Sequence, residues 1–570
     1  MSRRRITFEH LMYFGIFCLA LTVRLFKLGS SPLSDFEAGP ALQALGVSQG
    51  ARSMLGDNPV YVLLTAVNFF IFGSSSFWAR FWPALAGSTI VLVPGYFKNK
   101  IGQLPALLLA FFLVFDPGLL ALGRLAGSPI FAITFFALAL GMWESARPGW
   151  AGVFGALALM GGSAFWTGVL SLGLAWILFR VITRRRILGG LRTETQPGRS
   201  LRDRLKPALG WGLVVVVLGG TLFFIVPNGL FALWTSFTTY LLGWWNPASV
   251  PIGIMLAAIP AYAPLALVFG LTAGIRMIHR REQDHLLFCI WAFISFLLAI
   301  INRGRQPSDL AWILLPLYTL AAIELARHFS IEGIGKWEFT GVMILSLSIL
   351  AFCWIDLAGS SWMPFSSEST KTRFLLLLGA LLFLLVCYLL VAVGWSLKLA
   401  RSGLVWSWAV TLMVLTIGFA FGSAGLLHPQ TVELWQPFPS TGQADILLQT
   451  ANELSQWNTG QVAALGISIY GIDSNALRWL FRGWNTEEIV MLSADSSPDL
   501  VIAPQGAELG YPASYRGQDF TWRQTPIWND ISVEDGLRWF IFRQIHQYSE
   551  TIVLWARDDL HFESDRQDTP

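Results

Sequence analysis

The chain has 570 residues, of which 54% are hydrophobic and only 13% are charged, whereas a soluble domain carries about 25% charged residues. With a mean hydropathy of +0.56, this composition excludes a soluble enzyme, a secreted disulfide scaffold and a disordered protein, and it predicts a protein embedded in a bilayer. The net charge of +4 could suggest a nucleic-acid partner, but the distribution of the charge argues against one.

The charge divides the chain into two parts at residue 427. Residues 1–427 hold 31 Lys and Arg against 16 Asp and Glu, and residues 428–570 hold 8 against 19. We therefore predict a basic transmembrane domain over 1–427 and a small, acidic, soluble α/β domain over 428–570. The four cysteines all lie in apolar runs of the first part, and their spacing indicates neither a disulfide framework nor a zinc site.

Apolar windows of about 17–25 residues, the length that crosses a bilayer, recur along the first part. The run 59–75 is ambiguous and is interpreted as interfacial or re-entrant. The basic residues ahead of the first window could belong to a signal peptide, but no small-residue cleavage site follows, so the window is interpreted as a retained helix. We predict about thirteen transmembrane helices, at 8–26, 78–97, 104–122, 129–145, 149–164, 165–183, 207–226, 251–274, 285–301, 309–326, 338–357, 373–394 and 403–427.

The lysines and arginines orient these helices. With the N-terminus in the cytoplasm, the inner loops carry 22 basic residues, and the outer loops with their adjoining helix ends carry 9, as the positive-inside rule requires. The basic block over 180–206 is then cytoplasmic and is expected to contact anionic lipid. This orientation predicts a multi-pass plasma-membrane protein with an extracytoplasmic C-terminal domain.

The C-terminal part has an α/β pattern of apolar residues. Helices are predicted at 444–457 and in SNALRWLF, and short strands in VAALGIS, EEIVML, PDLVIAP and ETIVLWAR. Neither a glycine loop for phosphates nor a metal-binding motif is found there, and Asp495 and Asp499 are interpreted as solvated turn residues.

Two carboxylates follow the first predicted span on the outer side. Asp35 and Glu37 are separated by one residue, and such a pair at a membrane surface can accept a proton from a hydroxyl or coordinate a divalent cation. The spacing alone is a weak pattern, so a solvated pair of loop acids is the alternative.

Three arginines are predicted on the outer side, against the positive-inside trend. Arg124 follows the third predicted span, and Arg303 and Arg305 lie in one short outer loop. A guanidinium there is a forked donor for the oxygens of a lipid-linked phosphate or diphosphate. The alternatives are anchoring to lipid headgroups and pairing with Asp309 or Asp116.

Asp116 lies within an apolar span, where a carboxylate is a functional candidate. Pro117 follows it, so the helix is expected to break there, and Asp116 then caps the next segment or faces a cavity. The aromatic residues of the outer loop 227–250 predict an interfacial belt; the alternative is a lid or a surface that stacks on sugars.

The order of these motifs resembles the GT-C superfamily of membrane glycosyltransferases, and within it the family-39-like bacterial enzymes related to protein O-mannosyltransferases and aminoarabinose transferases. RLFKLGSSPLSDFEAGPALQA resembles the first outer loop of the family, where an arginine near the end of the first helix precedes an acidic pair. The segment FFIFGSSSFWARFWPALAG resembles its next motif, "lfG…aRl.pal.G", and DPGLLALGRLAGS resembles its "sR" outer turn. The similarity covers about residues 20–145, and ALRWLFRGW resembles a segment found after the spans.

The resemblance implies transfer of a sugar from a polyprenyl-phosphate donor, at an outer face of the bilayer, to a protein, lipid or glycan acceptor. Glu37 matches the second acid of the family's pair and Asp35 stands in for the first, so these two are the expected catalytic acids. If a divalent cation such as Mg or Mn takes part, the same two carboxylates would hold it. Asp116 and Asp309 are the candidate accessory acids. The arginines expected at the donor phosphate are Arg80 and Arg124, which match family arginines, with Arg303 or Arg305.

Two departures from the family pattern keep other functions open. Many relatives carry an acid a few positions after the "sR" arginine, where this chain has Ser128, and the acid pair here is D-x-E rather than D-E. Both departures favour a relative that binds lipid-linked glycan without catalysis. A transporter or flippase for lipid-linked sugars is a further alternative, which predicts internal repeats and midplane charges; no convincing repeat is found in the sequence.

Overall fold

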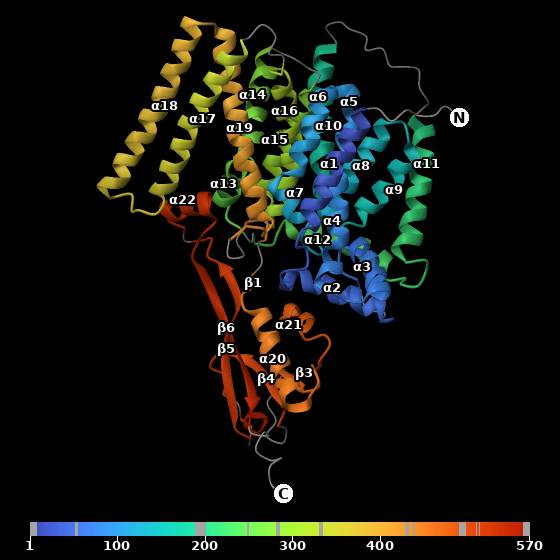
Figure 1. The fold of residues 1–570 in the computed structure, drawn as a ribbon. Helices are drawn as coiled ribbons and strands as arrows, with labels where there is room; N and C mark the ends of the chain where they lie inside the picture. Colours follow the sequence, from blue (N-terminus) through green and yellow to red (C-terminus); the bar gives the residue numbers. More distant parts are fainter. Residues whose placement is uncertain are drawn as a thin grey trace.

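A computed structural model of the protein describes residues 8–51, 55–187, 201–247, 250–280, 285–329, 335–427, 432–436, 439–489, 497–508, 510–511, 513–529 and 531–561. The helices up to residue 423 form a bundle, and the C-terminal residues form an α/β region that extends from one end of it (Figure 1). This layout makes the protein a polytopic helical membrane protein with its strands gathered outside the bundle.

Among the described residues, six helical segments are long and apolar enough to cross a membrane: α1 (Phe8–Leu25), α10 (Ala164–Ile187), α16 (Ala311–Ala326) together with the 3₁₀ turn Pro307–Leu310 before it, α17 (Lys336–Ser360), α18 (Glu368–Gly394) and α19 (Leu397–Ser423). A seventh span is added if α13 (Ile252–Tyr262) and α14 (Pro264–Arg280), which meet at 92°, count as one. Shorter apolar helices complete the bundle: α3 (Pro59–Phe72), α6 (Gln103–Val114), α8 (Ile130–Glu144), α9 (Pro148–Leu159) and α15 (Leu286–Ile301). The exact number of thirteen spans stays a prediction.

Several predicted spans are broken helices. The window 78–97 contains α4 (Ser76–Thr89), a 3₁₀ turn (Ile90–Leu92) and the start of α5 (Val93–Ile101), and the window 104–122 divides into α6 and α7 (Pro117–Leu122). Asp116 caps α7 by accepting a hydrogen bond from the Leu119 amide at 2.6 Å. The cause of the second break is the one expected, because Pro117 fits the first turn of a helix but cannot continue the preceding one.

The segments outside the bundle lie on the side of the C-terminal region. The run 59–75 forms α3, which packs against α2 (Asp35–Ser48), and both lie at this end of the bundle (Figure 1). Ser34 caps α2 and shares a capping box with Glu37. The predicted outer loop 227–250 contains a helix, α12 (Gly229–Gly243), while α11 (Leu201–Val214) continues into a π turn (Val215–Gly219).

The C-terminal region contains a six-stranded mixed sheet of order β1-β5-β6-β4-β2-β3. Helix α20 (Ala444–Thr459), β2 (Gly466–Tyr470), α21 (Asn475–Leu480), β3 (Asn485–Ile489), β4 (Leu500–Pro504) and β6 (Gln547–Arg557) overlap the predicted elements. The elements β1 (Ser440–Thr441), β5 (Tyr515–Pro526) and α22 (Val533–Phe542) do not appear in the sequence prediction. Strand β2 is parallel to β3 and β4, whereas β6 pairs antiparallel with β4 and β5.

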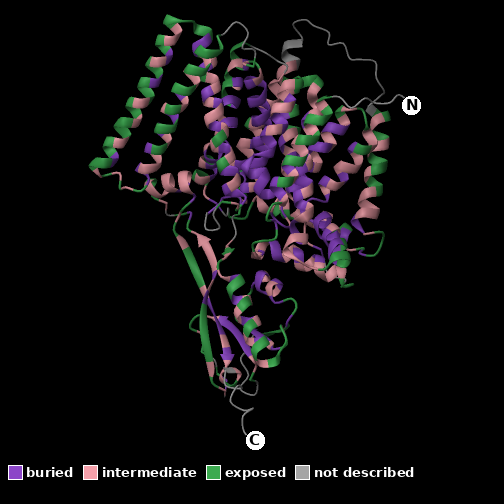
Figure 2. Ribbon diagram, in the orientation of Figure 1, coloured by how far each residue is buried: buried purple, intermediate pink, exposed green. Residues whose placement is uncertain are grey.

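Burial differs sharply across the bundle. Buried residues concentrate in its centre, whereas α17 and α18 stand at one edge with mostly exposed faces (Figure 2). Because their exposed residues are largely Leu, Phe and Val, we expect these faces to contact lipid.

Trp435 of the C-terminal region packs against the bundle. Its indole is 2% exposed and lies against α7 so closely that a Cβ added at Gly118 would be 2.5 Å from the Trp435 Cη2 atom. The Ser423 hydroxyl, at the end of α19, donates a hydrogen bond of 2.9 Å to the Pro117 carbonyl beside it. Three separate segments are therefore packed together at this point.

We expect Gly118→Ala to lower the free energy of unfolding by about 1–3 kcal/mol, the usual cost of overpacking a filled site. The measurement is the thermal unfolding midpoint in one detergent, with Gly155→Ala as control because nothing lies within 4 Å of a Cβ there. Equal midpoints for the two variants would show that Trp435 moves aside freely.

Candidate functional site

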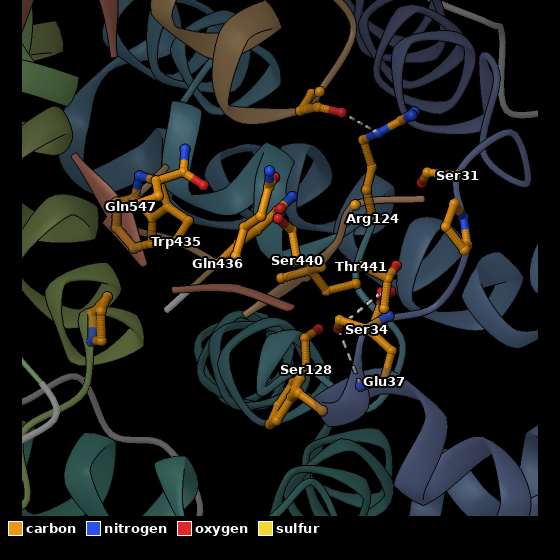
Figure 3. A pocket seen from close by; sticks show the side chains of 18 of the residues that line it. Ser31, Ser34, Glu37, Arg124, Ser128, Trp435, Gln436, Ser440, Thr441 and Gln547 are labelled. Atoms are coloured by element: carbon orange, nitrogen blue, oxygen red, sulfur yellow. Dashed lines mark hydrogen bonds between the residues drawn. The ribbon is translucent and has the colours of Figure 1, made fainter. Parts of the chain in front are cut away.

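A cavity of about 980 Å³ lies where the bundle meets the C-terminal region. Its walls come from residues 28–37 after α1, residues 122–129 after α7, residues 306–308, and the C-terminal segments around β1, β5 and the start of β6. In Figure 3, Glu37 and Ser128 of the bundle lie on one side of this space, and Gln436 and Gln547 lie on another. The volume is at the upper end of the range for ligand sites, about 300–1,000 Å³.

Glu37 lines the cavity, but its carboxylate is fully occupied by protein donors. Arg80 donates from Nε to Glu37 Oε1 and from Nη2 to Oε2, both at 2.7 Å. The Ala126 amide donates to Oε1 at 3.0 Å, and the Ser34 amide and hydroxyl donate to Oε2 at 3.2 Å. Burial alone would raise the pKa of Glu37, but the charge and hydrogen bonds of Arg80 hold that pKa below its usual value. The group is therefore a poor proton acceptor in this arrangement.

Arg80 is occupied in the same way. Beyond Glu37, it donates to the carbonyls of Leu28, Ser31 and Pro32 at 2.9–3.2 Å. The buried pair thus shapes the loop that carries residues 28–37 into the cavity wall, and it leaves Arg80 with little capacity to bind a phosphate. The sequence analysis did not foresee that these two residues pair with each other.

Asp35 is directed toward the C-terminal region and is not part of the cavity wall. Its Oδ1 accepts hydrogen bonds from the Ser474 hydroxyl at 2.6 Å and the Ala476 amide at 2.9 Å, and its Oδ2 pairs with Arg523 Nε at 2.7 Å. These contacts join α2 to α21 and β5 across more than 400 positions of sequence.

The predicted cation site at Asp35 and Glu37 does not fit this geometry. Each carboxylate already accepts hydrogen bonds on both oxygens and pairs with its own arginine, so a divalent cation would have to displace both guanidinium groups. Within the described residues, no three His, Cys, Asp or Glu side chains come together as metal ligands.

Arg124 lines the cavity as well. It donates to the carbonyls of Arg24 and Phe26 at 2.8 Å from Nη1, and to that of Ala424 at 3.1 Å from Nε. It thereby satisfies carbonyls at the end of α1 that lack helical partners. Its Nη2 makes a single long bond, of 3.4 Å to Lys27, so one edge of the guanidinium is available to a ligand.

The other predicted residues lie outside the cavity wall. Arg303 is exposed, and Arg305 is buried with one bond of 3.4 Å to the Ile300 carbonyl. Asp309 accepts a hydrogen bond from the Gln306 amide at 3.0 Å and thereby shapes the turn whose residues 306–308 do reach the cavity. Asp116 is completely buried in the bundle.

Four titratable residues of the cavity wall were not predicted from the sequence: Asp445, Asp535, Arg538 and His546. Asp445 is exposed in the first turn of α20 and has no ion-pair or hydrogen-bond partner among the described residues. Arg538 has a loose ion pair of 3.8 Å with Asp535 and lies over the Trp362 ring at 5.6 Å. Asp445 is an acid in the first turn of a helix, and Arg538 lies four residues before the end of another. Both are ordinary features, so the sequence gives no signal that marks either residue as part of a site.

A buried cluster of Tyr262, Glu433 and Arg543 connects the C-terminal region to α13. The Tyr262 hydroxyl donates to Glu433 Oε2 at 2.6 Å, and the Leu434 amide donates to the Tyr262 oxygen at 2.9 Å. Arg543 Nε lies 3.8 Å from the same carboxylate, and its Nη2 donates to the Ala261 carbonyl at 2.6 Å. Burial raises the pKa of Glu433 to about 7, against the opposing charge of Arg543 and the hydrogen bond from Tyr262.

The raised pKa of Glu433 in this cluster predicts that the free energy of unfolding depends on pH. Because the pKa of Glu433 rises from 4.5 to about 7 on folding, the folded protein binds more protons between these values. The stabilisation is full below about pH 4.5, falls as the pH rises toward 7 and is lost above it. We expect the thermal unfolding midpoint of the wild type to fall between pH 5 and 8 more than that of Glu433→Gln. The exposed Glu453→Gln serves as control, and parallel pH profiles of wild type and Glu433→Gln would contradict the prediction.

The fold is that of the GT-C membrane glycosyltransferases. The aminoarabinose transferase ArnT of Cupriavidus metallidurans bound to undecaprenyl phosphate aligns with 95% of this chain and 97% of its own, at 14% identity and a TM-score of 0.55. The apo form of that enzyme aligns over the same shares at a TM-score of 0.51. An oligosaccharyltransferase of Archaeoglobus fulgidus aligns at 12% identity and a TM-score of 0.42, over 84% of this chain and 64% of that one.

No protein-family model and no curated protein matches the chain. At 14% identity, the alignment with ArnT shows a shared fold, and the residues of the site have to support the function on their own.

Proposed function

We propose that the protein transfers a sugar from a polyprenyl-phosphate donor to an acceptor bound in the cavity, on the extracytoplasmic face of a plasma membrane. The observation that carries the proposal is the composition of this cavity: it joins Arg124 from the bundle, Arg538 from α22 and the carboxylate of Asp445, to which no described residue is bonded. The undecaprenyl phosphate bound by the ArnT neighbour supports a donor of this class.

The side of the membrane follows from the charge distribution. Residues 28–37, which follow α1, line the cavity, so the cavity lies at the opposite end of α1 from its start. The loops assigned to the cytoplasm carry most of the lysines and arginines, and this bias supports an extracytoplasmic cavity.

The proposed reaction assigns a task to each group. The acceptor hydroxyl oxygen attacks the anomeric carbon of the donor, and the bond from that carbon to the phosphate oxygen breaks. The phosphate leaves with the electron pair, and the weakly bonded Nη2 edge of Arg124 and the guanidinium of Arg538 stabilise its charge. The hydroxyl proton passes to Asp445. Glu37 and Asp35 are positioning residues in this proposal, because protein donors occupy both carboxylates.

The test is binding and turnover by the full chain in nanodiscs. We expect Arg538→Gln to weaken the binding of undecaprenyl phosphate about 10-fold or more, as expected for loss of a hydrogen bond to a charged group. Because none of the hydrogen bonds within the described residues starts from Arg538, the fold should persist. Arg303→Gln is the matched control, since Arg303 is exposed outside the cavity. If Arg303→Gln weakens binding and Arg538→Gln does not, the phosphate site lies at the loop that carries Arg303 and the assignment to the cavity fails.

The occupied carboxylates of Asp35 and Glu37 favour a second candidate, a GT-C relative that binds lipid-linked glycan without transferring it. Binding of undecaprenyl phosphate without turnover of any polyprenyl-phosphate sugar, in the wild type and in Asp445→Asn alike, would select this candidate.

A further inference from the structure

Glutamine side chains are unusually frequent in the polar wall of the cavity. Six of the chain's 18 glutamines line it: Gln306, Gln436, Gln443, Gln524, Gln544 and Gln547. Five of them belong to the C-terminal region, on the segments around β1, β5 and the start of β6. Such a concentration in one cavity requires a ligand or a structural reason.

Hydrogen bonds within the protein do not explain most of these amide side chains. The side chains of Gln436, Gln524, Gln544 and Gln547 make no hydrogen bond within the part of the chain that the structure describes. The fifth, Gln443, accepts a hydrogen bond on Oε1 from the Thr521 amide at 2.8 Å and keeps its NH₂ group unused. The wall therefore offers donors and acceptors in nearly equal number.

Charge on the cavity wall is largely cancelled. Glu37 is paired with Arg80, and Asp535 is shared by Arg538 at 3.8 Å and His546 at 3.9 Å. An anionic acceptor would need further unpaired cations, beyond the two arginines that the proposed function assigns to the donor phosphate. A neutral ligand suits the wall better, because amide groups pair with hydroxyls, which also both donate and accept.

Aromatic groups border the same space. Trp362 is 56% exposed and presents its ring beside Arg538. Trp435 is 2% exposed, yet its indole N–H has no hydrogen-bond partner among the described atoms. The exposed ring of Trp362 therefore gives the wall an apolar face beside its amide groups.

We infer that the glutamine wall binds a neutral carbohydrate, so that the acceptor of the proposed transfer is a glycan rather than a peptide or an anionic lipid. This inference rests on the proposed function and narrows it to one acceptor class. A peptide is disfavoured because the sheet edge at the cavity is β1, a strand of only two residues, which offers few backbone hydrogen bonds to an extended chain.

The experiment is saturation-transfer NMR on the full chain in nanodiscs. The probes are neutral oligosaccharides of three to six hexoses, matched oligosaccharides of uronic acids, and a Ser/Thr-rich peptide. We expect the neutral sugars to give transfer signals. The double variant Gln524→Leu, Gln547→Leu should weaken their binding about 10-fold or more, while Gln449→Leu, Gln456→Leu, on the exposed face of α20, should leave it unchanged.

Several results would overturn the inference: uronic acids that bind as tightly as neutral sugars, a peptide that binds where sugars do not, or equal binding by the two double variants. Binding of undecaprenyl phosphate and slow release of sugar to water are measured in the same preparations. If both occur while no neutral glycan binds, the acceptor inference fails and the transferase proposal stands. If undecaprenyl phosphate does not bind and no sugar is released, the transferase proposal itself fails.

Discussion

Asp445→Asn is expected to slow sugar transfer about 10²–10⁴-fold, the usual loss when a group that takes a proton in the transition state is removed. The fold should be unaffected, because Asp445 is exposed and no described residue pairs with it. Binding of undecaprenyl phosphate should also be preserved, because the proposed role of Asp445 is to take a proton from the acceptor hydroxyl and not to bind the donor phosphate. The measurement is single-turnover transfer from a polyprenyl-phosphate sugar, with the thermal unfolding midpoint recorded for each variant.

Three variants make this prediction selective. Glu453→Gln, on the same helix α20 but outside the cavity, should leave the rate unchanged, and Asp445→Glu should recover part of it. Asp35→Asn tests the role predicted from the family motif. If Asp35→Asn loses transfer at an unchanged unfolding midpoint while Asp445→Asn keeps its rate, Asp35 is the proton acceptor and the assignment to Asp445 is wrong.

Glu37→Gln is expected to lower the free energy of unfolding by about 3–5 kcal/mol, because it leaves the buried Arg80 guanidinium without its counter-charge. Glu37 is 2% exposed and Arg80 5%, so water cannot replace the lost partner. Arg80 also holds residues 28–32 through their carbonyls, so the cavity wall should be displaced in the same variant. The thermal unfolding midpoint and limited proteolysis measure the two effects.

A double variant separates structure from chemistry. Glu37→Leu, Arg80→Met removes both charges together, and we expect its unfolding midpoint to lie above those of Glu37→Gln and Arg80→Met alone. An unchanged midpoint in Glu37→Gln, together with lost transfer, would instead assign Glu37 the direct catalytic role that the motif implies.

The contacts of the two acids in the D-x-E motif could not be predicted from the sequence. Their spacing predicts neighbours on one surface, yet α2 begins at Asp35, and residues two apart on a helix do not face each other. Asp35 consequently turns to Ser474 and Arg523 of the C-terminal region, and Glu37 turns into the bundle toward Arg80. Neither partner could be predicted, because each lies more than 40 positions away in sequence.

The sequence by itself determined that this chain is a polytopic helical membrane protein with a strand-containing C-terminal part, because bilayer insertion depends on local runs of apolar residues and on the charges that flank them. It also identified the GT-C resemblance, because the motifs that carry it are contiguous. Only the tertiary structure decided which polar groups remain unoccupied. That property depends on contacts between distant segments: Glu37, Arg80 and Asp35 each accept or donate close hydrogen bonds there. Among the described residues, Asp445 and most of the cavity glutamines have no side-chain partner, and Arg538 has only a long ion pair with Asp535. Polar groups that share one cavity and keep hydrogen-bonding atoms unused are therefore the candidates for the chemistry of this protein.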